Sequence, residues 1–179
     1  MSKLEVDAIE PQSGTTLTIG ASGDTVALGS GVTSGAGMGK VLQVVNATFS
    51  TQTSSSSSTF ADTGLSASIT PSSSSNKILI FVNINGIYKQ TNNTGISLKL
   101  VRGVTDIHNI ESISGFTNDS SANATGSSST SYLDSPSTTS STTYKVTFNS
   151  FNNNAQVSIN ANSVTGGSVS TMTLIEIKG

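Results

Sequence analysis

The sequence predicts an all-β protein: a short N-terminal segment of repeated strands, followed by an antiparallel β-sandwich. Only 10% of the residues are charged, and Ser, Thr and Asn supply most of the polarity beside 17 glycines. Ser, Asn and Gly favour turns and Thr favours strands. Apolar residues recur in alternating runs at the spacing typical of a sandwich, and the N-terminal part contains a repeat.

The repeat consists of residues 13–20 (SGTTLTIG) and residues 22–29 (SGDTVALG), which are offset by nine positions. Each unit predicts a strand of about four residues between glycines, with side chains alternating between two faces. Such short strands bury an apolar face only by stacking on neighbours. We therefore expect residues 1–29 to form a stem that copies of the chain or a host assembly hold in order. Its expected core residues are Leu17, Ile19, Val26 and Leu28.

Residues 30–39 form the next segment, a glycine-rich neck. Five glycines between positions 29 and 39 remove any regular apolar face. Glycine-rich chain serves as a flexible linker, but it also permits close approach to a symmetry axis. Both interpretations remain open.

Residues 40–179 are expected to form the β-sandwich. The segment 77–85 is the most apolar of the chain, so we predict a central strand covered on both faces. Segment 96–101 alternates strictly, whereas the spacing within 104–113 predicts a strand with a bulge. Further strands are expected at 41–49, 60–69, 144–148, 157–159 and 172–177, with a short one at 132–133.

The turns and loops follow from polar runs. Residues 92–95 (NNTG) and Arg102-Gly103 predict turns, and Thr117–Ser131 predicts a long exposed loop. Only Lys178 and Gly179 are expected to lie beyond the last strand. About eight strands over roughly 140 residues match a jelly roll or a related two-sheet sandwich. Few Lys, Pro or bulges protect the sheet edges, which indicates cover by subunit contact.

Charge and hydropathy exclude several classes of partner. The formal net charge is −2 and Lys or Arg never form a run, so no nucleic-acid partner is expected. No apolar stretch is long enough to cross a bilayer, so no membrane insertion is expected. Residues 1–10 lack the basic start and apolar core of a signal peptide, so we do not expect export by the general secretory route.

The sequence also offers little for catalysis or for a cofactor. The single histidine, His108, is interpreted as a strand residue facing solvent or a loop. The six Asp and four Glu are scattered, apart from a close group at Glu5, Asp7 and Glu10. A calcium-binding repeat would need more carboxylates than Asp24 alone. We therefore expect no enzyme activity, no catalytic or metal-binding residues and no cofactor.

Residues 3–20 (KLEVDAIEPQSGTTLTIG), with residues 22–26 after them, resemble the opening of tail-fibre and related virion proteins of aquatic bacteriophages. Residues 39–45, 65–71, 77–80 and 173–177 are similar to the C-terminal β-domains of the same proteins. The resemblance touches nearly the whole chain and is strongest at the N-terminus.

This resemblance implies a homotrimer in which three N-terminal segments wind into a triangular prism and the sandwiches cluster as a knob. It implies a virion protein, assembled in the host cytoplasm, that docks on other virion proteins through its N-terminus. The β-sandwich would then be presented to a host-surface glycan or protein. The receptor-binding residues stay unknown at this stage, although the loops at Asn92–Asn93 and Thr117–Ser131 are candidates.

Two other functions remain open on the sequence alone. A capsid decoration protein or head fibre would share the sandwich and the trimer but would stabilise the shell. A glycan depolymerase would need converging carboxylates, for which the chain gives no signal.

Overall fold

The fold is described from a computed structural model of the chain. The structure describes residues 40–118, 123–152, 155–161 and 167–179. All of these residues belong to one unit of the chain, Gly39–Gly179. The predicted stem and neck, with Leu17, Ile19, Val26 and Leu28, lie outside the described residues, so their boundaries and roles stay predictions.

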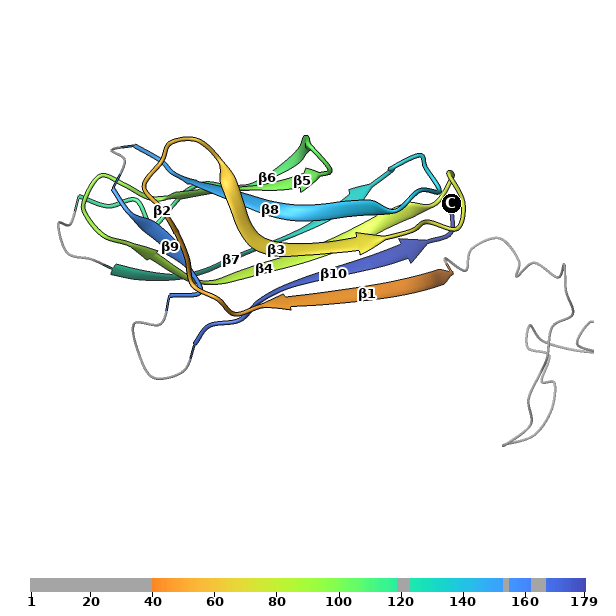
Figure 1. The fold of residues 1–179 in the computed structure, drawn as a ribbon, viewed down its shortest axis with the longest axis horizontal. Helices are drawn as coiled ribbons and strands as arrows, with labels where there is room; N and C mark the ends of the chain where they lie inside the picture. Colours follow the sequence, from red (N-terminus) through yellow and green to blue (C-terminus); the bar gives the residue numbers. More distant parts are fainter. Residues whose placement is uncertain (1–39, 119–122, 153–154, 162–166) are drawn as a thin grey trace, which may run out of the picture. The chain divides into compact units, whose positions relative to one another are not determined.

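The described residues contain ten strands and no helix, and they pair into two antiparallel sheets that pack face to face (Figure 1). This confirms the predicted all-β antiparallel sandwich. Sheet A contains β1 (Val41–Phe49), β2 (Thr53–Ser55), β4 (Lys77–Lys89), β7 (Asn123–Asp134), β9 (Val157–Ile159) and β10 (Ser170–Ile177). Sheet B contains β3 (Ala61–Ile69), β5 (Ile96–Arg102), β6 (Thr105–Ser114) and β8 (Thr142–Ser150).

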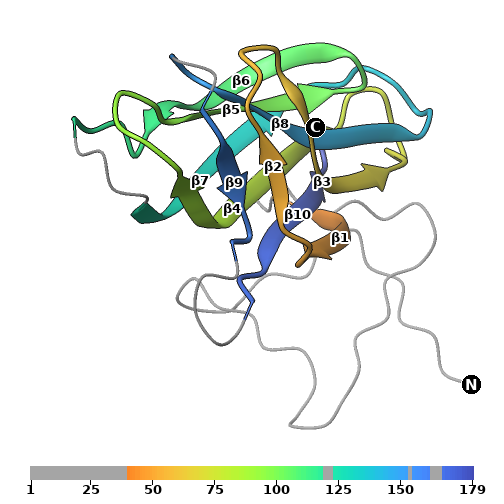
Figure 2. The same ribbon diagram turned by 60° about the vertical axis from the view of Figure 1, so that its left-hand side comes forward.

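The long strand β4 lies in the middle of sheet A. It pairs with β7 along one side, while β10 and then β9 occupy its other side. The chain stays in one sheet only between β1 and β2, β5 and β6, and β9 and β10, and every other connection crosses to the opposite sheet. Figure 2 shows the short pair β2 and β9 beside the end of β4. The connections therefore interleave the two sheets rather than building each one from consecutive strands.

Alternation along the strands creates a single core between the sheets. Inward residues from β4 and β10 in sheet A meet inward residues from β3, β5 and β8 in sheet B. Period-two alternation explains the set, because each of these strands carries an apolar residue at every second position. The largest fully buried apolar side chains include Tyr144, Phe148, Leu65, Ile69, Ile78, Ile80 and Ile84.

The prediction of a central strand at 77–85 was correct, but the described residues cover only one of its two faces. Ile78, Ile80, Val82 and Ile84 are buried, but the alternate side chain Phe81 is 46% exposed. Strand β4 also continues past Gly86, whose φ of +61° accompanies a register shift between Ile84 and Ile87. The sheet is thus covered on its inner face only within the described residues.

The prediction of an exposed loop from Thr117 to Ser131 was wrong. Residues from Asn123 onward form β7, which pairs with β4 from Lys89 to Ile78. A strand of Ser, Thr and Gly is held by its backbone hydrogen bonds to β4, so it needs no apolar alternation of its own. Sequence periodicity therefore gave no signal for most of this strand.

Other expected elements are present. The turn predicted at Arg102-Gly103 lies one residue later, at Gly103-Val104, because Arg102 still belongs to β5; Gly103 has a φ of +59°, which favours glycine. The β5–β6 pair contains register shifts, as predicted for residues 104–113. The last two residues, however, are held in place: the Lys178 amide donates to the Lys40 carbonyl, and the Gly179 amide donates to Asn76 Oδ1.

A buried polar cluster ties the two sheets together. Nη1 of Arg102 on β5 lies 2.9 Å from both carboxylate oxygens of Asp134 at the end of β7. The Tyr144 hydroxyl on β8 donates to the same carboxylate at 2.6 Å. Burial and this hydrogen bond to Asp134 raise the pKa of Tyr144 above its usual value, so the phenol stays protonated. The cluster joins β7 of sheet A to β5 and β8 of sheet B.

A second polar cluster closes one end of the sandwich around Glu176 on β10, which is 1% exposed. Its carboxylate accepts from the Ser72 amide at 2.6 Å, from Asn76 Nδ2 at 2.6 Å, from the Ser72 hydroxyl at 2.8 Å and from Gln43 Nε2 at 3.2 Å. Burial acts to raise the pKa of Glu176, but these donors outweigh it and hold the pKa below its usual range. The loop between β3 and β4 is thereby fixed to β10 and β1.

We predict that Glu176→Gln lowers the free energy of unfolding by about 1–3 kcal/mol at neutral pH, because its amide nitrogen faces groups that donate. A depressed carboxyl pKa stabilises the fold above the unfolded-state value, about 4.3, and this contribution is lost as the pH falls through the folded-state value. The deficit of the variant should therefore shrink on acidification. Urea unfolding from pH 7 to pH 2.5 measures this, with Asp62→Asn as control, because the Asp62 side chain is 60% exposed and its ion pair with Lys145 is worth little. A deficit that stays constant with pH would contradict the ionised state of Glu176.

Candidate functional site

The outer face of sheet A carries the candidate site, and its centre is Phe81. The cross-strand neighbours of Phe81 are Thr173 on β10 and Ser131 on β7. Directly opposed residues on one face of a sheet have their Cβ atoms about 4.5–5.5 Å apart. The exposed aromatic ring therefore lies between two short hydroxyl side chains that leave its face open.

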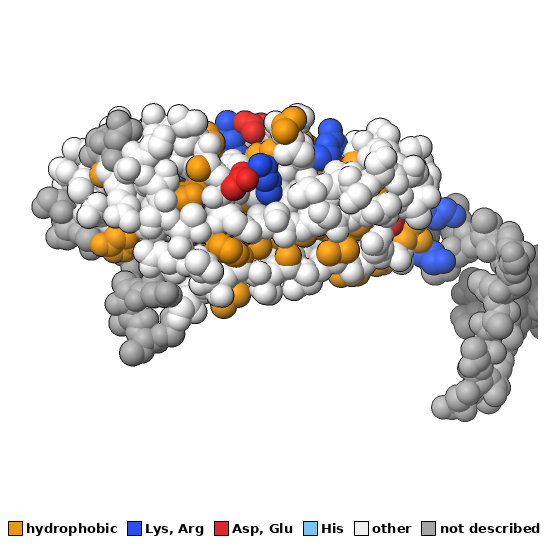
Figure 3. Space-filling view, in the orientation of Figure 1, with side chains coloured by type: hydrophobic (Ala, Val, Ile, Leu, Met, Phe, Trp, Pro, Cys, Tyr) orange, Lys and Arg blue, Asp and Glu red, His pale blue; other side chains and the backbone are white. Residues whose placement is uncertain are grey.

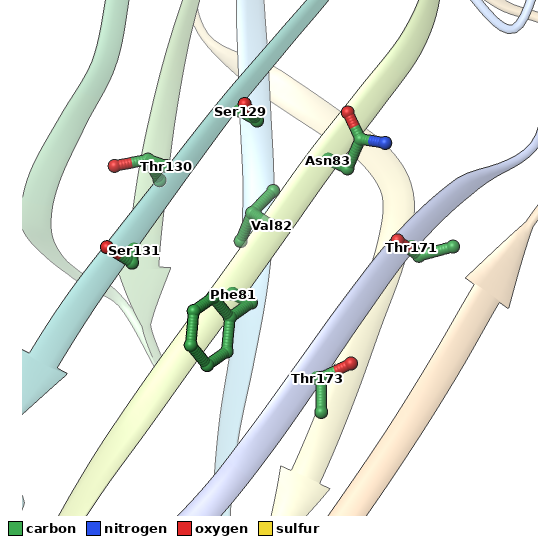
Figure 4. A pocket seen from close by; sticks show the side chains of 8 residues that line it. All are labelled: Phe81, Val82, Asn83, Ser129, Thr130, Ser131, Thr171 and Thr173. Carbon is green, nitrogen blue, oxygen red and sulfur yellow. The ribbon is translucent and has the colours of Figure 1, made fainter.

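The next row of the same face repeats this polar surround. Asn83 on β4 has Thr171 of β10 on one side and Ser129 of β7 on the other. Figure 4 shows the ring of Phe81 flanked by the threonines of β10 and the serines of β7. Together they form a shallow hollow of about 590 Å³, lined by Phe81, Val82, Asn83, Ser129, Thr130, Ser131, Thr171 and Thr173.

The surroundings of this hollow are almost free of charge. Of the described side chains that point outward from β1, β10 and β7, and from β4 between Lys77 and Asn83, only Lys77 is charged. Its neighbour Glu176 points inward and is already hydrogen-bonded. A ligand of this face would meet hydroxyls, an amide and an aromatic ring rather than ions.

Sheet B carries a contrasting outer face. Lys145 lies 2.8 Å from Asp62, and Lys99 lies 2.6 Å from Asp106. The Lys99 ammonium also lies 4.2 Å from the ring centroid of Phe60. In Figure 3, acidic and basic side chains lie close together in the upper half of the molecule, whereas hydrophobic side chains follow its lower side. Exposed ion pairs contribute little stability, so the charges chiefly make the two faces chemically different.

The lining of the hollow offers hydroxyl and amide groups beside an aromatic ring. Its lining contains no carboxylate, histidine or lysine that could transfer a proton. Within the described part of the chain, no group of three or more His, Cys, Asp or Glu residues is placed to hold a metal ion. No helix among the described residues has the length and apolarity to cross a membrane.

The histidine singled out from the sequence lies between the sheets. His108 on β6 stacks on Tyr132 of β7, with ring centroids 5.0 Å apart and planes inclined by 24°. Its Nε2 lies 3.0 Å from the Thr130 hydroxyl. The interpretation of a strand residue was correct, but the ring packs against β7 instead of facing only solvent or a loop.

The loops considered as receptor-binding candidates have structural contacts. The Asn93 amide donates to the Thr117 carbonyl, and Thr117 accepts from the buried Lys89 ammonium. Residues 119–122 lie outside the described residues, and residues 123–131 are on β7. These loop residues therefore have structural contacts, whereas Phe81 on the flat outer face of sheet A has an exposed ring.

Phe81 itself was missed by sequence reasoning. The candidates predicted from the sequence were the loops at Asn92–Asn93 and Thr117–Ser131, and neither contains an aromatic residue. A signal was present, because Asn83 and Asn85 share the period of Phe81 and indicate that this side of β4 faces outward. Leu79 is aliphatic and shares this period, so the outward-facing side of β4 resembles the buried side in its first half.

No protein-family model matches the chain, and no curated protein matches it in sequence.

Proposed function

We propose that the chain is a non-enzymatic structural protein of a bacteriophage particle, a short trimeric tail fibre or spike. Residues 1–29 would attach it to other virion proteins, and the β-sandwich would be presented outward. The proposal rests on the resemblance of residues 3–26 to virion fibre proteins and on the composition of the sandwich. A surface of mostly uncharged polar side chains suits a rigid, exposed component of a particle.

The order of the strands supports a jelly-roll assignment for the sandwich. Four of the eight longer strands, β1, β10, β4 and β7, lie side by side in sheet A. The other four lie in sheet B in the order β3, β8, β5 and β6. Eight strands divided between two sheets by such crossing connections are the plan of a jelly roll, which is common among capsid and lectin domains.

The observation that carries a binding role is the exposed ring of Phe81 within an uncharged hollow of hydroxyl groups. Sugars present apolar C–H faces beside hydroxyls, so a ring with Ser, Thr and Asn around it suits a neutral glycan. An acidic glycan would find only Lys77 as a cation on this face. The ligand class that the geometry supports best is therefore a neutral saccharide of the host surface.

We predict that Phe81→Ala weakens binding to neutral host polysaccharide about tenfold, because the stacking surface is lost. Phe151→Ala is the matched control: Phe151 is 43% exposed and packs edge-on against Phe116, at a ring-centroid separation of 6.1 Å. A glycan array followed by calorimetry on purified full chain measures the effect. Equal affinity of both variants and the parent would exclude the Phe81 hollow as the glycan site.

We predict that static light scattering of the purified chain gives three times the chain mass of 18.2 kDa. The repeat strands of residues 13–29 lack enough apolar residues for a core of their own, and three copies supply one. A monodisperse monomer would contradict the fibre proposal.

The position on the particle separates the fibre from a capsid decoration protein or head fibre. Antibody labelling of intact particles followed by electron microscopy should mark the tail. Labels confined to the capsid would favour the shell-stabilising role instead.

A further inference from the structure

A row of four aliphatic side chains crosses the outer face of sheet A. Val44 on β1 is opposite Ile175 on β10, Ile175 is opposite Leu79 on β4, and Leu79 is opposite Leu133 on β7. Opposed side chains on one face of a sheet are in contact range, so the row forms one continuous apolar stripe.

The stripe widens toward the start of β1. Val41 is opposite Ile177, and Val41 is 55% exposed. Val44 and Leu133, at the two ends of the row, are 58% and 49% exposed. We call this set the aliphatic patch; it consists of Val41, Val44, Leu79, Leu133, Ile175 and Ile177.

The patch differs from the outer face of strands β3 and β8 in sheet B. The corresponding outward positions of β3 in sheet B carry Ser66 and Ser68, and those of β8 carry Thr143 and Lys145. Contiguous exposed aliphatic side chains are costly in water and mark contact surfaces in soluble proteins. The aliphatic patch is therefore the candidate contact surface on this face.

We propose that the aliphatic patch contacts a second copy of this chain. The inference rests on the proposed function, in which copies assemble through residues 1–29. The 39 residues outside the described domain join it at Lys40, directly before Val41 of the patch. Copies held together by that segment present this end of the sandwich to one another at high effective concentration.

Charge also favours a copy of the same chain. The patch contains no carboxylate, and its one charged neighbour, Lys77, is exposed at the margin, where its ammonium can stay in water. Contact between copies would therefore bury no unpaired ion. A partner selected by charge would find nothing to recognise on this part of the face.

The aliphatic patch and the proposed ligand site occupy adjacent rows of the same face. The aliphatic row lies toward the Lys40 end of the strands, whereas the rows of Phe81 and Asn83 lie further along β4. One face is thus divided into an apolar half for assembly and a hydroxyl half for ligand.

Site-specific crosslinking tests the contact, because the natural chain contains no cysteine. Val44→Cys and Leu133→Cys place single thiols at the two ends of the row, and Ser66→Cys places a control thiol on exposed sheet B. Each full-length variant is treated with a short bismaleimide, and denaturing electrophoresis gives the fraction of crosslinked chains. Light scattering of the untreated variant gives its native mass. We expect crosslinked chains at Val44→Cys or Leu133→Cys, at least fivefold more than at Ser66→Cys.

Each outcome decides the question. An oligomeric mass with equal crosslinking at all three positions overturns the contact and leaves the fibre proposal intact. A monomeric mass overturns both. In a monomer, slow maleimide labelling of Val44→Cys relative to Ser66→Cys would further assign the cover of the patch to another segment of the same chain.

Discussion

The arrangement of sheet A depends on the register of β10 between β1 and β4. Leu174 opposite Ile80 is buried in the core, and this fixes Ile175 opposite Leu79 on the outer face. A slip of one residue would expose Leu174 and bury the threonines of β10, because side chains alternate with a period of two. The core, the aliphatic patch and the hollow around Phe81 are therefore consequences of one set of backbone hydrogen bonds.

Buried polar groups restrict that register further. Glu176 points into the end of the sandwich, where Ser72, Asn76 and Gln43 supply its donors. A shifted β10 would leave the carboxylate without these partners, and an unpaired buried charge is far more costly than a lost apolar contact. The same reasoning applies to Asp134, which receives Arg102 and Tyr144 from the opposite sheet. Both clusters therefore disfavour any other register of the strands that carry them.

Strands with alternating apolar residues could be predicted from the sequence. A strand that is held mainly by backbone hydrogen bonds to its neighbour could not. Strands β3, β5, β8 and β10 follow from their own periodicity, since each contributes apolar side chains at alternate positions to the core. Strand β7 consists mainly of Ser, Thr and Gly, so only its pairing with β4 reveals it. Phe81 was missed for a related reason: Ile, Leu, Phe and Val in succession look alike whichever side is covered. The partners of Glu176 are distant in sequence, and periodicity carries no information about them.

The division of the outer face reconciles two demands that would otherwise conflict. Apolar side chains promote assembly, but spread over the whole face they would also promote aggregation. Here they are limited to the rows nearest Lys40, and the following rows change to Asn46, Thr173 and Ser131 around a single ring. In the proposed function, a shallow, uncharged hollow of this kind would bind each saccharide weakly, since few groups are desolvated and none is ionic. In this proposal, contact through the apolar half of the face holds several hollows on one assembly. Their combined binding then gains affinity by avidity over that of a single hollow.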